Sequence, residues 1–312
     1  MDEKKTYILA YLDVLGFTKL VEEKGLEKIY KMYESLIEKV NLVVERYRSS
    51  RFSVHVPIFK TAMGKIYVVR FEIEYAYASD TILVWCEFNR VNIVPFLECI
   101  ITLFCSALEI EMPLRGTITF GDAILSKSKS IYIGKPIIEG AICEKWQAWI
   151  GITFGKALID NIEYGWLGEL KNIIPFDEHI KTKDGDIPDS TASYGIINIV
   201  LDWPRFIRIN GKNNEISKWL EAKTNDPLLP FTVRKYYALT CKFMKYSQEN
   251  SEWYNFFDFQ QSQLGGYSAD HSKGTISVYN SSVEEWCNNQ AGVLLVKSIR
   301  DSAVTGDATV ES

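Results

Sequence analysis

The run Tyr7–Thr18 constrains the fold more than any other stretch of the 312-residue chain. It begins with six apolar or aromatic residues, which is typical of a buried strand, and then reaches Asp13 and a Gly-Phe-Thr turn. A carboxylate at the tip of a buried strand costs free energy unless its charge has a partner or a function. We therefore expect this strand to deliver Asp13 to a site, with a long amphipathic helix after the turn.

A second apolar run, Tyr75–Trp85, carries another acid, Asp80, which we expect to close a strand as Asp13 does. Magnesium binds one or two carboxylates together with water and substrate phosphates, and carboxylates on adjacent strands can hold two ions about 3.5–4 Å apart. The hypothesis is that Asp13 and Asp80 lie side by side on neighbouring strands and hold divalent metal. The alternative is that each aspartate is an ordinary turn residue or helix N-cap.

The composition argues against several other classes of protein. A net charge of −5 offers no basic surface for duplex nucleic acid. The N-terminus shows no signal peptide, and the longest apolar stretch, 93–110, is interrupted by Pro95, Glu98 and Glu109 and is too short to span a membrane. The six cysteines show no CxxC spacing, so we expect reduced thiols in a cytoplasmic protein, without disulfides or zinc.

Hydrophobic periodicity predicts alternating strands and helices in the first half of the chain. We expect strands at 6–12, 114–124, 131–134 and 151–154, a hairpin of 66–73 with the run that carries Asp80, and helices at 22–47, 91–111 and 136–149. This order is that of a ferredoxin-like split βαβ, an α+β fold in which the first strand and the hairpin are central. Asp13 then lies beside Asp80.

Two further features are candidates for binding phosphate. Gly16, Phe17 and Thr18 stand where a helix begins, and backbone N–H groups at a helix N-terminus bind anions. A plain turn is the alternative for these three residues. Arg115 opens a predicted strand, where its guanidinium can clamp phosphate oxygens, unless it is a solvated or ion-paired surface residue.

These motifs resemble those of a known family, the class III nucleotidyl cyclases. Tyr11–Thr18 is similar to the motif that opens their catalytic domain, and Ala78–Asp80 resembles the position of their second metal-binding aspartate. Leu114–Asp122 is similar to the strand that carries their phosphate-contacting arginine. Ile133–Ala141 matches the place of the helix that usually brings an Asn and an Arg to the transition state. The resemblance covers residues 5–154, about half of the chain.

The sequence shows no repeats and no low-complexity linker, so we expect one domain with an elaboration and not two independent domains. Residues 1–200 would form a class III cyclase catalytic domain, and residues 201–312 a C-terminal elaboration packed on the same domain. The resemblance has further implications. The enzyme would act as a homodimer with its sites built across the interface, and no nucleic acid or membrane would be a partner. The implied metal ligands for two Mg²⁺ or Mn²⁺ ions are Asp13, Val14 and Asp80, and the implied catalytic residues are Asp13, Asp80 and Arg115.

Four positions depart from the adenylyl cyclases of this family. Lys135 and Ala76 stand where those enzymes carry the Asp and the Lys that read adenine. Ile138 and Ile142 stand where they carry the catalytic Asn and Arg. The specificity for ATP or GTP therefore does not carry over to this chain.

With these departures, and with the helix that carries Glu139, Glu144 and Lys145, the run Gln147–Gly151 and the run Asp202–Arg205, the chain looks like the bacterial pyrimidine cyclases of the Pycsar anti-phage system. That resemblance implies conversion of UTP or CTP to cyclic UMP or cyclic CMP as an alarm signal. Tyr75 or Tyr77 can supply ring area and a hydroxyl for the smaller base. Regular strand alternation puts both tyrosines opposite Asp80, unless a bulge intervenes.

Two other functions stay open. The first is a catalytically inactive cyclase-homology module that binds nucleotide or a partner protein, which the loss of the helix Asn and Arg favours. The second is another two-metal phosphoryl enzyme on a palm-like fold, such as a diguanylate cyclase or polymerase. Ser79–Thr81 is unlike the Gly-Gly-Asp-Glu-Phe hairpin of diguanylate cyclases, so this second alternative ranks last.

Overall fold

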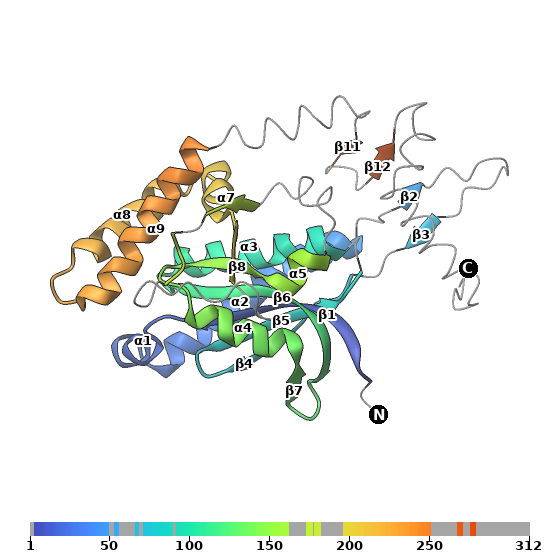
Figure 1. The fold of residues 1–312 in the computed structure, drawn as a ribbon, viewed down its shortest axis with the longest axis horizontal. Helices are drawn as coiled ribbons and strands as arrows, with labels where there is room; N and C mark the ends of the chain where they lie inside the picture. The colour runs from blue at the N-terminus through green and yellow to red at the C-terminus, as the bar shows by residue number, and fades with distance from the viewer. Residues whose placement is uncertain are drawn as a thin grey trace. The chain divides into compact units, whose positions relative to one another are not determined.

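The structure is a computed structural model, and it describes residues 3–49, 53–55, 66–68, 71–89, 92–161, 173–176, 178–181, 196–250, 267–270 and 275–278. These residues fall into two compact units (Figure 1). The first unit spans Met1–Arg51 and Val69–Tyr254, and the second spans Phe52–Val68 and Asn255–Ser312. The expected boundary at residue 200 falls inside the first unit, and the division into a catalytic domain and a C-terminal elaboration stays a prediction.

The first unit is built on one mixed sheet with helices. Its elements in chain order are β1 (Lys5–Val14), α1 (Phe17–Lys24), α2 (Leu26–Ser49), β4 (Glu74–Ala78), β5 (Thr81–Glu87), α3 (Ile93–Glu109), β6 (Leu114–Ser126), β7 (Ile131–Gly134), α4 (Lys135–Lys145), β8 (Gly151–Gly155), α5 (Lys156–Asn161), β9 (Ile173–Pro175), β10 (Ile196–Leu201), α7 (Trp203–Ile209), α8 (Asn213–Asn225) and α9 (Phe231–Glu249). In the second unit, β2 (Ser53–His55), β3 (Ile66–Val68), β11 (Tyr267–Asp270) and β12 (Thr275–Val278) form a separate small sheet.

The strand order of the large sheet confirms the predicted fold class. Its described strands run β4-β5-β1-β6-β8-β10-β9, with β7 on the side of β6. The pairs β4–β5, β5–β1 and β1–β6 are all antiparallel, which is the arrangement of a ferredoxin-like split βαβ. β8 then adds parallel to β6, and β10 adds antiparallel to β8. β1 is therefore a central strand, as predicted.

The two faces of β1 meet different layers. Ile8, Ala10 and Leu12 alternate along one face and are fully buried. Ile82, the register partner of Leu12, is paired on its other side with Tyr77, whose ring lies 5.0 Å from that of Tyr33 on α2. This face therefore packs on the layer that α2 forms with α3. Leu9 lies on the other face, and its partner Thr119 donates a hydrogen bond of 2.8 Å to the Pro136 carbonyl of α4. α4 therefore covers the opposite face of the sheet.

The packing of α4 against β1 depends on a glycine. A Cβ on Gly140 would lie 2.5 Å from the Cβ of Tyr11, closer than carbon atoms approach one another in folded proteins. We expect Gly140→Ala to lower the free energy of unfolding by about 1–3 kcal/mol, because α4 must move off the sheet. Alanine is ordinarily the more stabilising of the two residues inside a helix. Urea unfolding of the wild type and the variant measures the difference, and a variant more stable than the wild type would contradict this packing.

A buried carboxylate fastens α4 to the next element. Glu139 is fully buried, its Oε1 accepts a 3.1 Å hydrogen bond from the Ala157 N–H at the start of α5, and its Oε2 has no partner among the described residues. Burial raises the pKa of Glu139 to about 7, against the hydrogen bonds from the α5 backbone that lower it. The folded protein therefore binds this proton more tightly than the unfolded chain. The free energy of unfolding falls as the pH rises from about 4.5 through 7.

This linkage predicts a pH-dependent effect of Glu139→Gln. The neutral amide keeps the acceptor for Ala157 and avoids the buried charge. We expect the variant to equal the wild type near pH 4.5 and to exceed its free energy of unfolding by about 2–3 kcal/mol at pH 8. Urea titrations at both pH values test this, and a stability difference that does not change with pH would rule the linkage out.

Three sequence-based boundaries were wrong. The hairpin around Asp80 pairs β4 with β5 across a turn at Ser79 and Asp80, whereas residues 66–68 belong to the other sheet. Asp80 therefore precedes a strand instead of closing one. The helix expected at 22–47 is two helices, since α1 ends at Lys24 and Gly25 adopts a φ of 78°. The helical pattern runs on across Gly25, so periodicity alone did not reveal the break.

Helices α7 and α9 are held next to the ends of β10 and β8 by buried polar groups. Asp202 caps α7 by accepting a hydrogen bond from the Arg205 N–H, and it also accepts one of 2.5 Å from the Ser247 hydroxyl of α9. The Thr240 hydroxyl of α9 accepts a 2.9 Å hydrogen bond from the Ile150 N–H. α8 and α9 lie side by side as a helical hairpin (Figure 1). Within the described part of the chain, no helix has both the length and the apolar character that a membrane crossing requires.

Candidate active site

Asp13 lies at the end of β1 between two register partners. It is opposite Thr81 of β5 on one side and opposite Arg115 of β6 on the other. Residues directly opposite each other in an antiparallel pair project to the same face of the sheet. The side chain of Asp13 is 23% exposed, so it reaches solvent from a mostly buried position. The predicted strand thus delivers Asp13 to an accessible edge.

Asp80 reaches the same place from the β4–β5 turn. Its carbonyl oxygen accepts a hydrogen bond of 2.9 Å from the Val14 N–H, which fixes the turn to the end of β1. The charge of Asp80 is close enough to contribute to the raised pKa of Asp13. The structure therefore brings Asp13, Val14 and Asp80 together, although they come from distant parts of the chain.

The turn that carries Asp80 has a second anchor that the sequence did not reveal. Ser79 adopts a φ of 58°, a left-handed conformation that is unfavourable for a residue with a side chain. The Tyr33 hydroxyl of α2 donates a hydrogen bond of 3.1 Å to the Ser79 carbonyl. Burial raises the pKa of Tyr33, and the charges of Asp80 and Asp13 raise it further, which places this phenol near both acids. Tyr33 thus helps to hold the turn beside β1.

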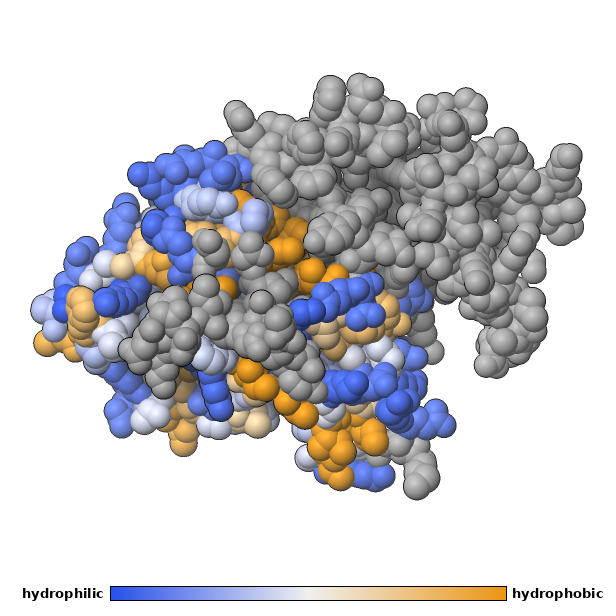
Figure 2. Space-filling view, in the orientation of Figure 1, coloured by the Kyte–Doolittle hydropathy of each residue, from blue (hydrophilic) through white to orange (hydrophobic). Residues whose placement is uncertain are grey.

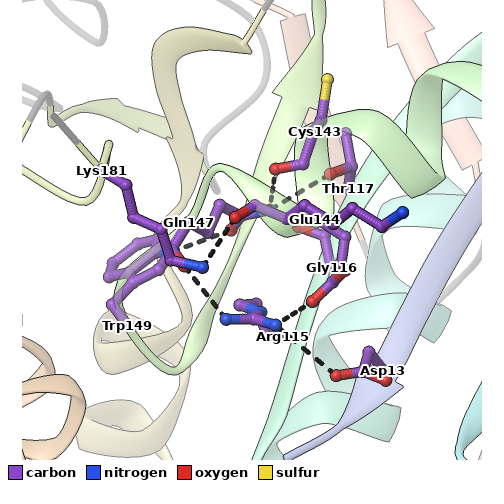
Figure 3. Close-up of polar contacts among 10 residues, drawn as sticks. Asp13, Arg115, Gly116, Thr117, Cys143, Glu144, Gln147, Trp149 and Lys181 are labelled. Carbon is purple, nitrogen blue, oxygen red and sulfur yellow. Dashed lines mark hydrogen bonds and ion pairs between the residues drawn. The ribbon is translucent and has the colours of Figure 1, made fainter. Parts of the chain in front are cut away.

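Arg115 forms the centre of a buried ionic cluster (Figure 3). Its guanidinium ion-pairs with Glu144 of α4, lies 3.7 Å from the Asp13 carboxylate, and donates a hydrogen bond of 3.0 Å to the Gln147 carbonyl. Arg115 is only 9% exposed, so it is not a solvated surface residue. The interior of the protein strengthens such pairs and also makes an unpaired member costly.

Gln147 is the main residue of this site that sequence reasoning missed. It is fully buried, and its Nε2 donates hydrogen bonds to the Gly116 carbonyl at 2.9 Å and to the Thr117 hydroxyl at 3.2 Å. Its Oε1 accepts a hydrogen bond of 2.9 Å from the Trp149 indole. Gln147 therefore ties the end of α4 to the start of β6, beside Arg115. The only signal in the sequence was its place in the run 147–151, which suggested no role.

The charges around Asp13 favour a cation. Burial raises the pKa of Asp13 to about 6, the negative charges of Glu144 and Asp80 raise it as well, and Arg115 opposes them. Two carboxylates held together in this way are hard oxygen donors, which suit Mg²⁺ or Mn²⁺. No group of three or more His, Cys, Asp or Glu side chains among the described residues has the arrangement of a metal site. The site therefore fits a metal ion that binds two protein carboxylates and completes its coordination with water and phosphate oxygens.

The Gly-Phe-Thr segment lies next to these acids. α1 begins at Phe17, directly after Gly16, which adopts a φ of 70° and has no atom within 4 Å of where a Cβ would be. Gly16 and Thr18 are exposed and Phe17 is half-buried. No side chain caps the first turn of α1, so its N–H groups start beside the end of β1 without a side-chain partner. The phosphate-binding role of these residues stays a prediction.

The two tyrosines of β4 project from the opposite face of the sheet to Asp13. Tyr75 and Tyr77 are register partners of Val84 and Ile82, on the face that packs on α2 and α3, and the Tyr77 ring lies 5.0 Å from that of Tyr33. The pairing of β4 with β5 is regular and contains no bulge that turns them over. Their role in binding a base stays a prediction. Ala76, between them, lies on the other face and packs against the cluster of Leu9 and Leu83.

Large apolar side chains are exposed on α4, at the two positions that resemble those of the catalytic Asn and Arg, and on β7. Ile138 and Ile142 of α4 are 51% and 37% exposed, and Ile131 and Ile133 of β7 are 45% and 57% exposed. We call these four residues the isoleucine patch. Hydrophobic surface is visible over α4 and β7 in the lower part of Figure 2. Lys135 begins α4 at the edge of this patch.

Comparisons with known proteins give structural resemblances only. No protein-family profile matches the chain, and no curated protein sequence matches it either. One similar solved structure is that of a bacterial light-regulated adenylyl cyclase, with a TM-score of 0.36 and 10% identity over 59% of this chain and 55% of that one. The chain thus matches about half of the length of that protein.

Another similar structure is the catalytic core of a rhodopsin-guanylyl cyclase with converted specificity, in complex with ATPαS. The TM-score is 0.38 and the identity is 9%, over 63% of this chain and 94% of that one. The assignment of the site rests on the residues of this chain and on their geometry.

Proposed function

We propose that the protein is a nucleotidyl cyclase that converts UTP or CTP to the 3′,5′-cyclic monophosphate and pyrophosphate. The observation that carries this proposal is the convergence of Asp13 and Asp80 at the end of β1, with the Asp80 carbonyl bonded to the Val14 N–H at 2.9 Å. Asp13, Asp80 and the carbonyl of Val14 would hold two Mg²⁺ or Mn²⁺ ions. When bound, such ions polarise the attacking oxygen and neutralise charge on the leaving phosphates.

The residues of the chain then act mainly by positioning and by charge. In the reaction, the ribose 3′-oxygen forms a bond to the α-phosphorus, the bond to pyrophosphate breaks, and the hydroxyl proton leaves to solvent. Arg115 contributes positive charge 3.7 Å from the Asp13 carboxylate, on the face where phosphates would bind. The N–H groups at the start of α1, with Gly16, Phe17 and Thr18, are close enough along the chain to receive phosphate oxygens.

The choice of a pyrimidine rests on the sequence resemblance to the Pycsar cyclases, and the departures from the adenylyl cyclases support a base other than adenine. Ala76, which packs against Leu9 and Leu83, offers no side-chain group that could hydrogen-bond to adenine. Lys135 replaces the adenine-reading acid of adenylyl cyclases, and Tyr75 and Tyr77 remain candidates for contacts with the base. By its sequence resemblance to Pycsar cyclases, the product would be an anti-phage second messenger.

The isoleucine patch supports a homodimer. Exposed, large apolar side chains such as these on β7 and α4 are typical of a surface that another protein covers. A second copy of the chain would cover it and complete the active site, as the resemblance implies. Sedimentation of the wild type against an Ile133→Asp/Ile138→Asp variant tests this, and an unchanged oligomeric state would contradict it.

A catalytically inactive nucleotide-binding module is the second candidate. Two observations favour it, because Arg115 is engaged by Glu144 and because Ile138 and Ile142 supply no hydrogen-bond donor to a transition state. Incubation of the purified protein with each of the four ribonucleoside triphosphates and Mn²⁺, followed by mass spectrometry, separates the candidates. We expect cyclic UMP or cyclic CMP together with pyrophosphate. No product from any triphosphate would favour the inactive module, and a linear dinucleotide would favour a palm-type enzyme.

A further inference from the structure

The C-terminal helix α9 reaches the buried Arg115 cluster, although no motif of the first half of the chain requires it. The guanidinium carbon of Arg115 lies 5.7 Å from the centre of the Tyr236 ring, within the range of a cation–π contact. Tyr236 is half-buried on α9. The other contacts of Arg115 are polar, and its buried Nε has no hydrogen-bond partner among the described residues. The hydrogen bonds therefore do not satisfy the whole guanidinium group, and the ring of Tyr236 provides a further contact for it.

One face of α9 is fixed beside this cluster at several points. Thr240, one turn after Tyr236, accepts the hydrogen bond from the Ile150 N–H. Phe243, a further turn along, packs edge-on against Trp149 with ring centres 4.8 Å apart. The Trp149 indole in turn donates to Gln147, whose carbonyl accepts from Arg115. α9 thus supports Arg115 twice, directly through Tyr236 and indirectly through Trp149 and Gln147.

The same ring also lies next to a second cation. The Nζ of Lys181 is 5.7 Å from the centre of the Tyr236 ring and donates a hydrogen bond of 2.6 Å to the Lys145 carbonyl. Tyr236 therefore interacts with two positive charges that repel each other. Loss of the ring removes attraction from both cations and leaves Arg115 held only by its acidic partners and one carbonyl.

We propose that Tyr236 is a positioning residue of the active site, which holds the guanidinium of Arg115 in place from the C-terminal helices. This inference rests on the proposed cyclase function for its kinetic consequence, but the contact itself does not. The helices after residue 200 then serve catalysis as well as stability. The ring is the essential part, because a cation–π contact needs the aromatic face and not the hydroxyl.

Three variants test the proposal kinetically, with UTP or CTP and Mn²⁺. We expect Tyr236→Leu to lower kcat about five- to thirty-fold with a smaller change in KM, as loss of a desolvated cation–π contact predicts. Tyr236→Phe should stay within about two-fold of the wild type, since it keeps the ring face. Lys235→Ala, on the neighbouring residue whose charge lies over the Phe231 ring, should not change the kinetics. Equal losses for the Phe and Leu variants would overturn the proposal.

A stability measurement distinguishes failure of this inference from failure of the proposed function. Tyr236→Leu is placed in the wild type and in an Arg115→Met/Glu144→Met background, and the urea midpoints are compared. We expect a smaller shift of the midpoint in the second background, because the guanidinium is already absent. Equal shifts would overturn the positioning role even if the enzyme is active. If the wild type forms no product but the shifts differ, the proposed function fails and the contact stands.

Discussion

Asp13→Asn and Asp80→Asn should each lower the rate of cyclic nucleotide formation by about a thousand-fold or more, because each removes the charge of a proposed metal ligand. The amide side chain is nearly isosteric with the carboxylate, so the fold should survive. For Asp13 the change also removes a charge that burial and neighbouring acids already disfavour, so the variant should be no less stable than the wild type at pH 8. Product formation with Mn²⁺ and unfolding in urea measure the two effects.

Asp122→Asn is a matched control for these variants. Asp122 is an acid on β6, paired in register with Thr6 near the other end of β1, where it accepts hydrogen bonds from Thr6 and Lys4. It lies on the same pair of strands but away from the site. We expect its activity to equal that of the wild type. An Asp13→Asn or Asp80→Asn enzyme as active as the control would remove the basis of the metal assignment.

Arg115→Met should have the largest effect on stability. The variant leaves Asp13 and Glu144 close together without a counter-charge, in a place where Arg115 itself is only 9% exposed. Removing one partner of a buried ion pair destabilises by about 3–5 kcal/mol. Burial raises the pKa of Asp13 to about 6 against the opposing effect of Arg115, so the variant raises that pKa further and the loss should be larger at pH 8 than at pH 5. Urea titrations at the two pH values give the free energies of unfolding.

The double variant Arg115→Met/Glu144→Met separates charge from packing. Replacing a whole buried ion pair by apolar residues of similar size is often close to neutral for stability. We expect it to recover most of the stability lost in Arg115→Met, while remaining inactive. If the double variant is as unstable as the single one, Arg115 supports the fold through its packing and not through the charges of Glu144 and Asp13.

The fold was predictable because its signals are local. The apolar run that ends at Asp13 and the helical periodicities identified the split βαβ, and the central position of β1 followed from that topology. The position of Asp80 was predicted less well, since Ser79 turns the chain at a φ of 58° without the glycine or asparagine that marks such a turn. The expectation that both acids come together nevertheless agrees with the observed Val14–Asp80 hydrogen bond.

The rest of the site was not predictable because it depends on contacts between distant segments. In the sequence, Glu144 and Gln147 are polar residues at the end of a helix. Their contacts become apparent only when β6 places Arg115 beside them. Tyr236 lies still further along the chain, in a helix whose pattern explains burial but not a contact with Arg115. Periodicity shows which face of an element is buried, but it does not identify the side chains that meet there.

A crystal structure with Mn²⁺ and a non-reactive UTP or CTP analogue tests the central claim most directly, because manganese is located by its anomalous scattering. We predict two peaks about 3.5–4 Å apart that are bound by the carboxylates of Asp13 and Asp80, with the Val14 carbonyl as a further ligand of one ion. The triphosphate should complete the coordination and lie toward Arg115. Anomalous peaks elsewhere, or bound nucleotide with no manganese at Asp13 and Asp80, would contradict the account.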